Sequence, residues 1–171
     1  MKDELVDIVD ESDSVIGTVI RKEMREKNLL HRCTYILVFS SNNEVLVTKR
    51  TNTKDVAPGL YEIGQGGVVA HGESYEENAE RELLEEVGIK SKLSYLFDFN
   101  FNSNKGRFIA KVFTCKYDGK IKLQKEEIES GFFISMEKLR GMLKKNQKSF
   151  TSDSIVMIKK YFEYLSKLPK S

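Results

Sequence analysis

One segment constrains the fold of this chain more than any other: a glycine-rich stretch that leads directly into an acidic helix. Three glycines fall within residues 64–67, and residues 74–87 then contain neither glycine nor proline. Ser74 and Glu77 have the spacing of a capping box, in which each side chain bonds to the other residue's backbone N–H. Gly88 suits the left-handed conformation with which many helices end. The sequence therefore predicts a helix over residues 74–87 with both ends marked.

The predicted helix separates apolar from acidic residues. At about 100° per residue, one face carries three apolar residues and is expected to face the core: Ala79, Leu83 and Val87. The flank beside it carries three carboxylates at positions i, i+3 and i+4: Glu82, Glu85 and Glu86. Carboxylates this close repel one another, which raises their pKa values or requires counter-cations, and hard oxygen ligands suit Mg²⁺ or Mn²⁺. Arg81, four residues before Glu85, can neutralise part of that charge and orient a glutamate.

A run of glutamates is often only the solvated face of an amphipathic helix, but the surrounding pattern favours a metal site here. Residues 67–89, GVVAHGESYEENAERELLEEVGI, match every fixed position of the pattern G-x5-E-x7-R-E-U-x-E-E-x-G-U, in which U is an apolar aliphatic residue. At ordinary residue frequencies, a chance match in a chain of this size has a probability on the order of one in ten million. The pattern is the Nudix box, and the chain therefore resembles the Nudix hydrolase superfamily.

This resemblance implies both a fold and a chemistry. Nudix enzymes fold as an α/β/α sandwich with a mixed β-sheet, and they use Mg²⁺ or Mn²⁺ to split nucleoside diphosphates linked to another group, or other diphosphates. Carried over to matching positions, the metal ligands would be Glu82, Glu85, Glu86 and the Gly67 carbonyl. Glu73 would reach the metal through water or hold the loop in shape, and Arg81 would orient the catalytic groups. The candidates for the general base are Glu85 and a later loop residue, Glu126 or Glu127, for which simple solvation is the alternative.

The main rival chemistry is isomerisation. Four segments look like the isomerase-like branch of the superfamily, which includes isopentenyl-diphosphate isomerase: LVDIVDESDSVIG, LLHRCTYILVF, LVTKRTNTK and APGLYE. The isomerases carry a cysteine and a metal-binding histidine where this chain has Gly66 and Val68, and their own box is degraded. Without that thiol, protonation of the substrate lacks its acid, so we predict hydrolysis of a phosphoanhydride. His31 matches an isomerase metal ligand but lacks the partner histidine, and we interpret it as structural.

A second rival, from another class, is a sensor that binds a diphosphate ligand without turnover. Loss of the box carboxylates would favour it, and none is lost. Outside the box, Lys49 and Arg50 end a predicted strand where their cations could hold a diphosphate, with a plain surface role as the alternative. His71 occupies a variable position of the box and is expected to be an exposed loop histidine. We expect the loops 49–60 and 102–107 to select the rest of the substrate.

The remaining segments predict a layered α/β domain over residues 1–171. Residues 1–30 predict an N-terminal β-hairpin, Leu5–Val9 with Val15–Ile20, and a short polar helix over 22–27. The other expected strands are 34–39, 44–48, 93–101, 108–117 and 128–135, with an interrupted strand over 61–69, and the expected closing helices are 136–145 and 152–168. Helices between and after mixed strands argue for an α/β/α sandwich. The alternating phenylalanines of 97–101 are expected to lie in the core or an interface.

Composition narrows the partners. Lys and Arg number 28 against 26 for Asp and Glu, which gives a formal charge of only +2 and does not indicate nucleic-acid binding. The N-terminus lacks the pattern of a signal peptide, and no run of eighteen apolar residues occurs, so a cytoplasmic protein without a membrane segment is expected. Cys33 and Cys115 lie in apolar runs and are expected to be buried thiols. The small-molecule diphosphate is the expected partner, and the hairpin and the phenylalanine strand offer surfaces for a homodimer.

Overall fold

The computed structural model describes residues 4–169, so residues 1–3 and 170–171 of the expected domain lie outside the described residues. The strands are β1 (Leu5–Val9), β2 (Val15–Ile20), β3 (His31–Phe39), β4 (Glu44–Arg50), β5 (Tyr61–Ile63), β6 (Ser94–Ser103), β7 (Gly106–Lys116) and β8 (Ile128–Ser135). The α-helices are α1 (Arg21–Glu26), α2 (Tyr75–Val87), α3 (Met136–Asn146) and α4 (Ser152–Lys167), and a 3₁₀ turn, Gln147–Ser149, precedes α4. Every predicted element is present.

The sheet is mixed, as predicted, because one parallel pair lies among antiparallel ones. β3 pairs in parallel with β7 over nine positions, from His31 opposite Phe108 to Phe39 opposite Lys116. β7 also pairs with β6, and β4 pairs with β5 and with β8, in each case antiparallel. The predicted start of β3 at Thr34 was three residues late. His31 joins the strand because it pairs with Ile8 on one side and with Phe108 on the other.

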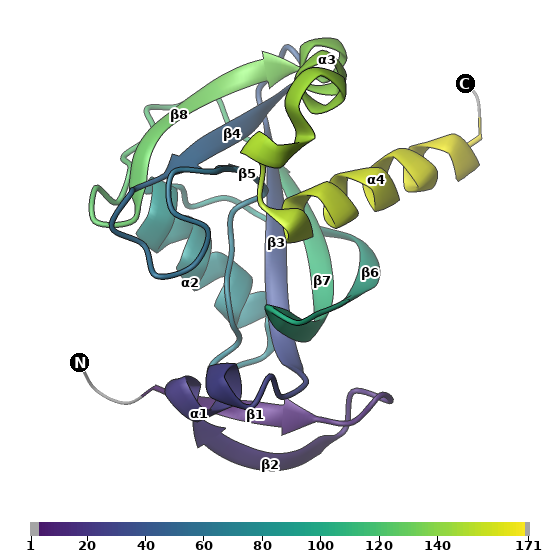
Figure 1. Cartoon of the computed structure of the whole chain (residues 1–171). Coiled ribbons are helices and arrows are strands. Elements are labelled where there is room, and N and C mark those ends of the chain that lie inside the picture. Colours follow the sequence, from purple (N-terminus) through teal and green to yellow (C-terminus); the bar gives the residue numbers. More distant parts are fainter. Residues whose placement is uncertain (1–3, 170–171) are drawn as a thin grey trace.

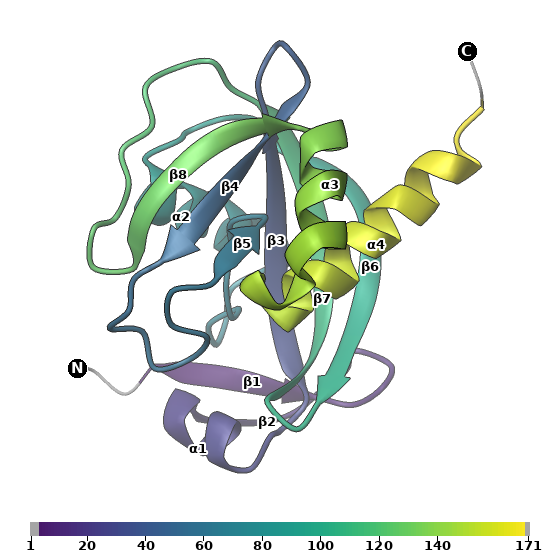
Figure 2. The same ribbon diagram turned by 45° about the horizontal axis from the view of Figure 1, so that its top comes forward.

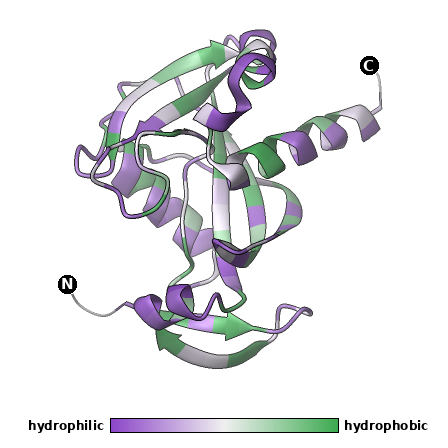
Figure 3. Cartoon of the chain, in the orientation of Figure 1, coloured by the Kyte–Doolittle hydropathy of each residue, from purple (hydrophilic) through white to green (hydrophobic). Residues whose placement is uncertain are grey.

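Helices cover both faces of this sheet (Figures 1 and 2). α2 covers one face through a core cluster that includes Ile36, Val38 and Leu83. α3 and α4 cover the opposite face through a second cluster that includes Leu37, Leu139 and Met157. Figure 3 shows hydrophilic residues along much of α2, since only its sheet-facing side is apolar. The predicted α/β/α sandwich with an N-terminal hairpin is confirmed.

The strands β3 and β4 pair at only one position, Phe39 opposite Val45, and the glycine segment runs beside the rest of β3. Ile36 and Gln65 exchange two backbone hydrogen bonds, of 2.6 and 2.9 Å, and Thr34 N donates to the Gly67 carbonyl at 2.9 Å. The segment that leads into α2 is therefore held against a central strand by backbone bonds. This pairing fixes the position of the acidic helix.

Most expectations about individual buried residues are confirmed. Cys33 and Cys115 are both buried free thiols. Phe99 and Phe101 belong to the core, and Phe97 packs against it and forms a tilted ring pair with Tyr164, with centroids 5.5 Å apart. None of the helices in residues 4–169 combines the length and the apolar character needed to cross a bilayer.

Candidate active site

The acidic helix α2 forms as its sequence predicts. Ser74 Oγ accepts a hydrogen bond from Glu77 N at 3.2 Å, and Glu77 Oε2 accepts one from Ser74 N at 2.8 Å, which completes the capping box. Gly88 ends the helix with φ of 69°. The predicted inward face is buried against the sheet: Ala79, Leu83 and Val87. Because this face is fixed, the flank that carries the carboxylates has only one direction to point.

That flank lines a cavity of about 900 Å³. Glu82, Glu85 and Glu86 line it together with Gly66 and Gly67. Other walls come from α1, from residues of the 51–60 loop and from Lys105 in the β6–β7 turn. Both loops that were expected to select the substrate thus reach the same cavity as the carboxylates.

Glu86 is the most deeply placed of the three carboxylates. Its Oε2 accepts a hydrogen bond from Gly66 N at 3.0 Å, so the carboxylate directly contacts the glycine segment. Burial raises the pKa of Glu86 well above its ordinary value, and the nearby carboxylates of Glu62 and Glu82 raise it further. A cation beside Glu86 would relieve this desolvation and repulsion.

Two glycines let the segment pass between β3 and α2. A Cβ on Gly66, whose φ is +139°, would lie 2.1 Å from the Thr34 carbonyl oxygen, which is shorter than any tolerable contact. A Cβ on Gly67 would lie 3.0 Å from the Glu82 carboxylate. Glycine therefore keeps a small space open beside Glu82, with the Gly67 carbonyl on the same backbone.

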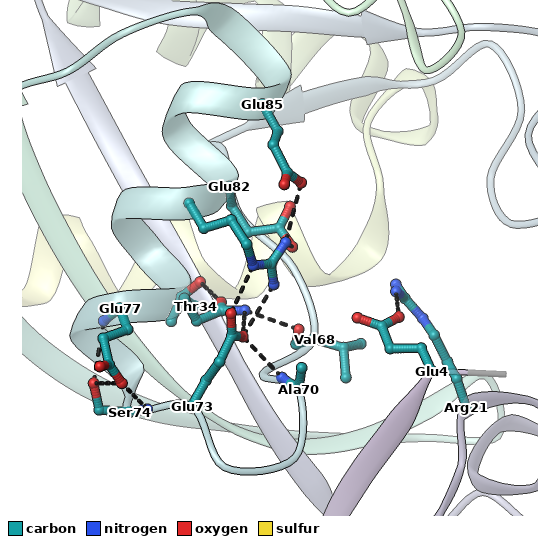
Figure 4. A network of polar contacts seen from close by, with 12 residues as sticks. Glu4, Arg21, Thr34, Val68, Ala70, Glu73, Ser74, Glu77, Glu82 and Glu85 are labelled. Carbon is teal, nitrogen blue, oxygen red and sulfur yellow. Dashed lines mark hydrogen bonds and ion pairs between the residues drawn. The ribbon is translucent and has the colours of Figure 1, made fainter. Parts of the chain in front are cut away.

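Arg81 donates hydrogen bonds to three carboxylates, those of Glu73, Glu82 and Glu85, which Figure 4 shows close together. Its Nε and Nη2 donate to the two oxygens of Glu73, at 2.7 and 3.0 Å, and its Nη1 donates to Glu82 and Glu85, at 3.0 and 3.1 Å. Ala70 N and Asn78 Nδ2 also donate to Glu73. The network supports the orienting role predicted for Arg81, and for Glu73 it favours the alternative in which that residue holds the loop in shape.

Replacing Glu73 with Gln is expected to lower the free energy of unfolding by roughly 2 kcal/mol at neutral pH, because charge-assisted hydrogen bonds are lost. Hydrogen bonding to Arg81 is the largest cause that lowers the Glu73 pKa, from 4.5 to about 2. A depressed pKa gives stability that is complete above the unfolded-state value near 4.5 and lost as the pH falls toward 2. Urea unfolding measured across this pH range should show that the variant loses less of its free energy of unfolding than the wild type does. Glu80→Gln, at an exposed position of α2, is the control and should behave as the wild type. Identical pH dependence in the Glu73 variant would contradict the role.

The oxygen donors of the site are of the kind that binds a divalent cation, although their side chains do not point to one common position. Within residues 4–169 no three His, Cys, Asp or Glu side chains meet at one point. Arg81 holds Glu82 and Glu85, while Glu86 faces Gly66. Burial and the Glu85 charge raise the Glu82 pKa, with Arg81 opposing them. Partly buried carboxylates with raised pKa values, beside a space that a Cβ would fill, form a set of hard oxygen donors suited to Mg²⁺ or Mn²⁺.

The structure separates the two late base candidates. Glu127 lines the cavity and forms an ion pair with Lys54, with Nζ and Oε2 2.7 Å apart. Glu126 is not among the cavity residues, and its carbonyl accepts a hydrogen bond from Thr51 Oγ1 at 3.2 Å. Glu127 is therefore the later acidic residue that can approach a bound substrate.

Of the two cations predicted to contact the substrate, Arg50 lines the cavity and Lys49 does not. Arg50 lines the cavity, and its guanidinium donates to Glu62 Oε1 at 2.6 Å and to the Val56 carbonyl at 3.0 Å. Lys49 instead forms an ion pair with Glu129 at 3.0 Å and does not line the cavity. Adjacent residues of a strand point to opposite faces, so only one of the two can face the cavity.

Sequence reasoning missed two polar residues near the site, the buried Asn78 and the half-buried Glu62. Asn78 is fully buried in α2; its Nδ2 donates to the Val68 carbonyl at 3.0 Å, and its Oδ1 accepts from Thr34 Oγ1 at 2.6 Å. Glu62, on β5, lines the cavity and has its pKa raised by burial, against the opposing charge of Arg50. Both residues had a signal in the sequence. Asn78 is an amide next to the apolar face of the predicted helix, and Glu62 is a carboxylate within a short apolar strand.

The two histidines lie where their interpretation placed them. His31 is buried, and its Nδ1 contacts the Leu29 carbonyl at 2.9 Å; burial is the main cause that lowers its pKa. His71 is exposed in the loop before α2, where its Nδ1 lies 2.6 Å from Asp7 Oδ1. The burial of His31 agrees with a structural role, and His71 is an exposed loop histidine as predicted; His31 additionally lines the cavity.

Comparison with known proteins identifies a family. The model of the NUDIX domain matches residues 29–154. An uncharacterized Nudix hydrolase of Pseudomonas aeruginosa is 41% identical over 135 residues, which cover 78% of this chain and 80% of that protein. The crystal structure of DR0079 from Deinococcus radiodurans has a TM-score of 0.71 at 22% identity, covering 82% of this chain and 88% of the other. The NUDIX domain of Shewanella oneidensis NrtR, solved with ADP ribose, has a TM-score of 0.61 at 17% identity, covering 78% and 87%.

Proposed function

The chain belongs to the Nudix hydrolase family, and we propose that its substrate is a small nucleoside-diphosphate-linked molecule or a related diphosphate, hydrolysed at a phosphoanhydride bond. The cavity of about 900 Å³ suits a ligand of this size. A neighbour of similar fold, the NrtR domain, binds ADP ribose, which is a molecule of this class. The isomerase-like branch of the superfamily remains a prediction from the sequence.

The observation that carries the proposal is the meeting of the glycine segment with the acidic flank. Glu86 accepts a hydrogen bond from Gly66 N, and a Cβ on Gly67 would lie only 3.0 Å from the Glu82 carboxylate. In the proposal, Glu82, Glu85 and Glu86 hold Mg²⁺ or Mn²⁺, together with the Gly67 carbonyl. That carbonyl already accepts a bond from Thr34 N, but an oxygen has a second lone pair. The bound metal would neutralise phosphate oxygens and lower the pKa of the attacking water.

The protein's own groups would orient the reactants and move the proton. Arg81 fixes Glu82 and Glu85 through direct hydrogen bonds and is itself anchored by Glu73. Glu85 or Glu127 would accept the proton of the attacking water. Lys54 lies within the cavity beside Glu127, where its ammonium can contact a phosphate oxygen. Arg50 contributes by holding the 51–60 loop through Val56 and by offering its positive charge to the cavity.

The structure also supplies a reason to prefer hydrolysis over isomerisation. The isomerases carry their acidic thiol at the position of Gly66. In this chain a Cβ at that position would overlap the Thr34 carbonyl oxygen. The backbone conformation as well as the residue identity therefore opposes a cysteine there.

Removing divalent metal is expected to abolish product release, and adding Mg²⁺ or Mn²⁺ back should restore it. The purified protein would be incubated with nucleotide sugars, dinucleoside polyphosphates, coenzymes, nucleoside triphosphates and prenyl diphosphates, with and without a chelator, and the products identified by mass spectrometry. Full activity in the chelator would contradict the metal role. Ligand binding without product from any substrate would favour the sensor, and conversion of isopentenyl diphosphate would favour the isomerase.

A further inference from the structure

The N-terminal module forms a wall of the cavity. Arg21, Met24 and Arg25 of α1 contribute to the lining, together with Asn28, two residues after the end of the helix. Met24 is buried in the core, and Asn28 Nδ2 donates to the Ser103 carbonyl at 2.8 Å, so the short helix is fastened to the body of the protein. Figure 4 shows Arg21 facing the cluster of Glu82 and Glu85 from the other side of the view. The helix α1 that follows the hairpin is therefore part of the site.

The cations that line this cavity are not all neutralised by partners. Arg21 pairs with Glu4 at 2.5 Å, Arg50 with Glu62 at 2.6 Å and Lys54 with Glu127 at 2.7 Å, while Arg81 contacts three glutamates. Two cavity cations form neither an ion pair nor a side-chain hydrogen bond within residues 4–169: Arg25 and Lys105. Of these two, Arg25 belongs to α1.

Arg25 also experiences repulsion from its neighbours. Burial is the largest cause that lowers its pKa, and the guanidinium of Arg21 is the next. Arg50 acts in the same direction, whereas Asp55 and Glu4 act in the opposite one. Arg21, Arg25 and Arg50 thus share this side of the cavity with the carboxylates of Glu4, Asp55 and Glu62, and of the three guanidiniums only Arg25 has no carboxylate in direct contact within residues 4–169. An anion bound there would relieve the repulsion.

We propose that Arg25 binds a second anionic group, a phosphomonoester carried by the part of the substrate that lies beyond the scissile diphosphate. The inference rests on the proposed function, since it concerns the same cavity and the same substrate. The planar fork of guanidinium donors matches phosphate oxygens in geometry. A phosphomonoester carries up to two negative charges, so it suits a place where several cations meet better than a single carboxylate does. Arg25 is then a specificity-determining residue that favours phosphorylated over unphosphorylated forms of the same coenzyme.

Matched substrate pairs test this directly. NADPH differs from NADH, and coenzyme A from its 3′-dephospho form, by one phosphomonoester. The wild type should prefer the phosphorylated member of at least one pair in kcat/KM by about tenfold to a hundredfold, the effect expected of one charge-assisted contact. Arg25→Gln should reduce that preference to about twofold or less, and Arg25→Glu should reverse it. Lys22→Gln is the matched control, because Lys22 lies on the same helix, is exposed and does not line the cavity.

A binding measurement separates this inference from the proposed function. Calorimetry without metal would compare the dissociation constants of adenosine 2′,5′-bisphosphate and adenosine 3′,5′-bisphosphate with that of 5′-AMP. Tighter binding of a bisphosphate that is lost in Arg25→Gln would support the subsite even if no substrate were hydrolysed. Equal binding of all three nucleotides by the wild type, or a preference that survives Arg25→Gln, would overturn it. A preference abolished by Lys105→Gln but not by Arg25→Gln would likewise refute the assignment to α1.

Discussion

Replacing Glu85 with Gln is expected to lower kcat by roughly three orders of magnitude or more, with little change in the free energy of unfolding. Glu85 is exposed, and its one direct side-chain contact in residues 4–169 is Arg81 Nη1 at 3.1 Å, so the fold does not depend on it. Glutamine keeps the size of the side chain but removes the negative charge. In the proposed site this removes a metal ligand and a candidate base at once.

The measurement combines steady-state kinetics with a metal titration. The Glu85→Gln variant should require a higher concentration of Mg²⁺ or Mn²⁺ for its residual activity, whereas Glu80→Gln should behave as the wild type. Glu80 is the matched control because it is an exposed glutamate of the same helix outside the cavity. Unchanged turnover in the Glu85 variant would remove the central assumption of the mechanism.

A parallel variant at Glu127 identifies the base. If Glu127 accepts the proton, Glu127→Gln should lower kcat and abolish the acidic limb of the pH–rate profile while leaving the metal requirement unchanged. If Glu85 accepts it, Glu127→Gln should mainly alter KM, since Lys54 loses its ion pair and its position changes. The two outcomes differ in kcat and in the acidic limb of the pH–rate profile.

Substituting Ala for Gly66 is expected to destabilise the protein by about 3–5 kcal/mol, by combining backbone strain with overpacking. The φ of +139° is a conformation that residues with a Cβ rarely adopt, and the added Cβ would lie 2.1 Å from a backbone oxygen of β3. A backbone oxygen cannot move aside as the end of a side chain can. Relief would require separating the glycine segment from β3, which would break the bonds that Ile36 and Thr34 make with it.

Chemical denaturation of Gly66→Ala and of a matched glycine variant would check this value. Gly141 lies within α3, and a Cβ there would meet nothing within 4 Å. Gly141→Ala should therefore be neutral or stabilising by about 0.5–1 kcal/mol. Similar stability of Gly66→Ala and the wild type would mean that the segment can shift, and the structural argument against a cysteine at this position would then fail.

Much of the site followed from short-range pattern. The limits of α2, its buried face and its acidic flank depend on residues within four positions of one another, and a helix has one geometry. The capping pair, Ser74 and Glu77, and the final glycine, Gly88, marked the two ends of the helix. The β-hairpin and the closing helices were predictable for the same reason, since turns and amphipathic periods are local. The comparisons then confirmed the family that the box indicated.

Other features depend on partners distant in the sequence. The residue pattern predicts the strand only from Thr34 onwards, and His31 joins it because Ile8 and Phe108 pair with it on either side. The half-buried Glu62 and the buried Asn78 have partners, Arg50 and Thr34, that lie elsewhere in the chain. A single sequence carries no signal of such pairings.

The acidic signature was thus determined by the sequence alone: which residues form the helix, which carboxylates share a flank, and which metal chemistry suits them. Only the tertiary structure decided what those carboxylates face. Arg25 joined the cavity because the hairpin folds back against the body, and Lys49 was excluded because β4 turns it away. The physical reason is one of range: helical geometry acts over a few residues, whereas a binding cavity is enclosed by segments that meet only when the core is buried.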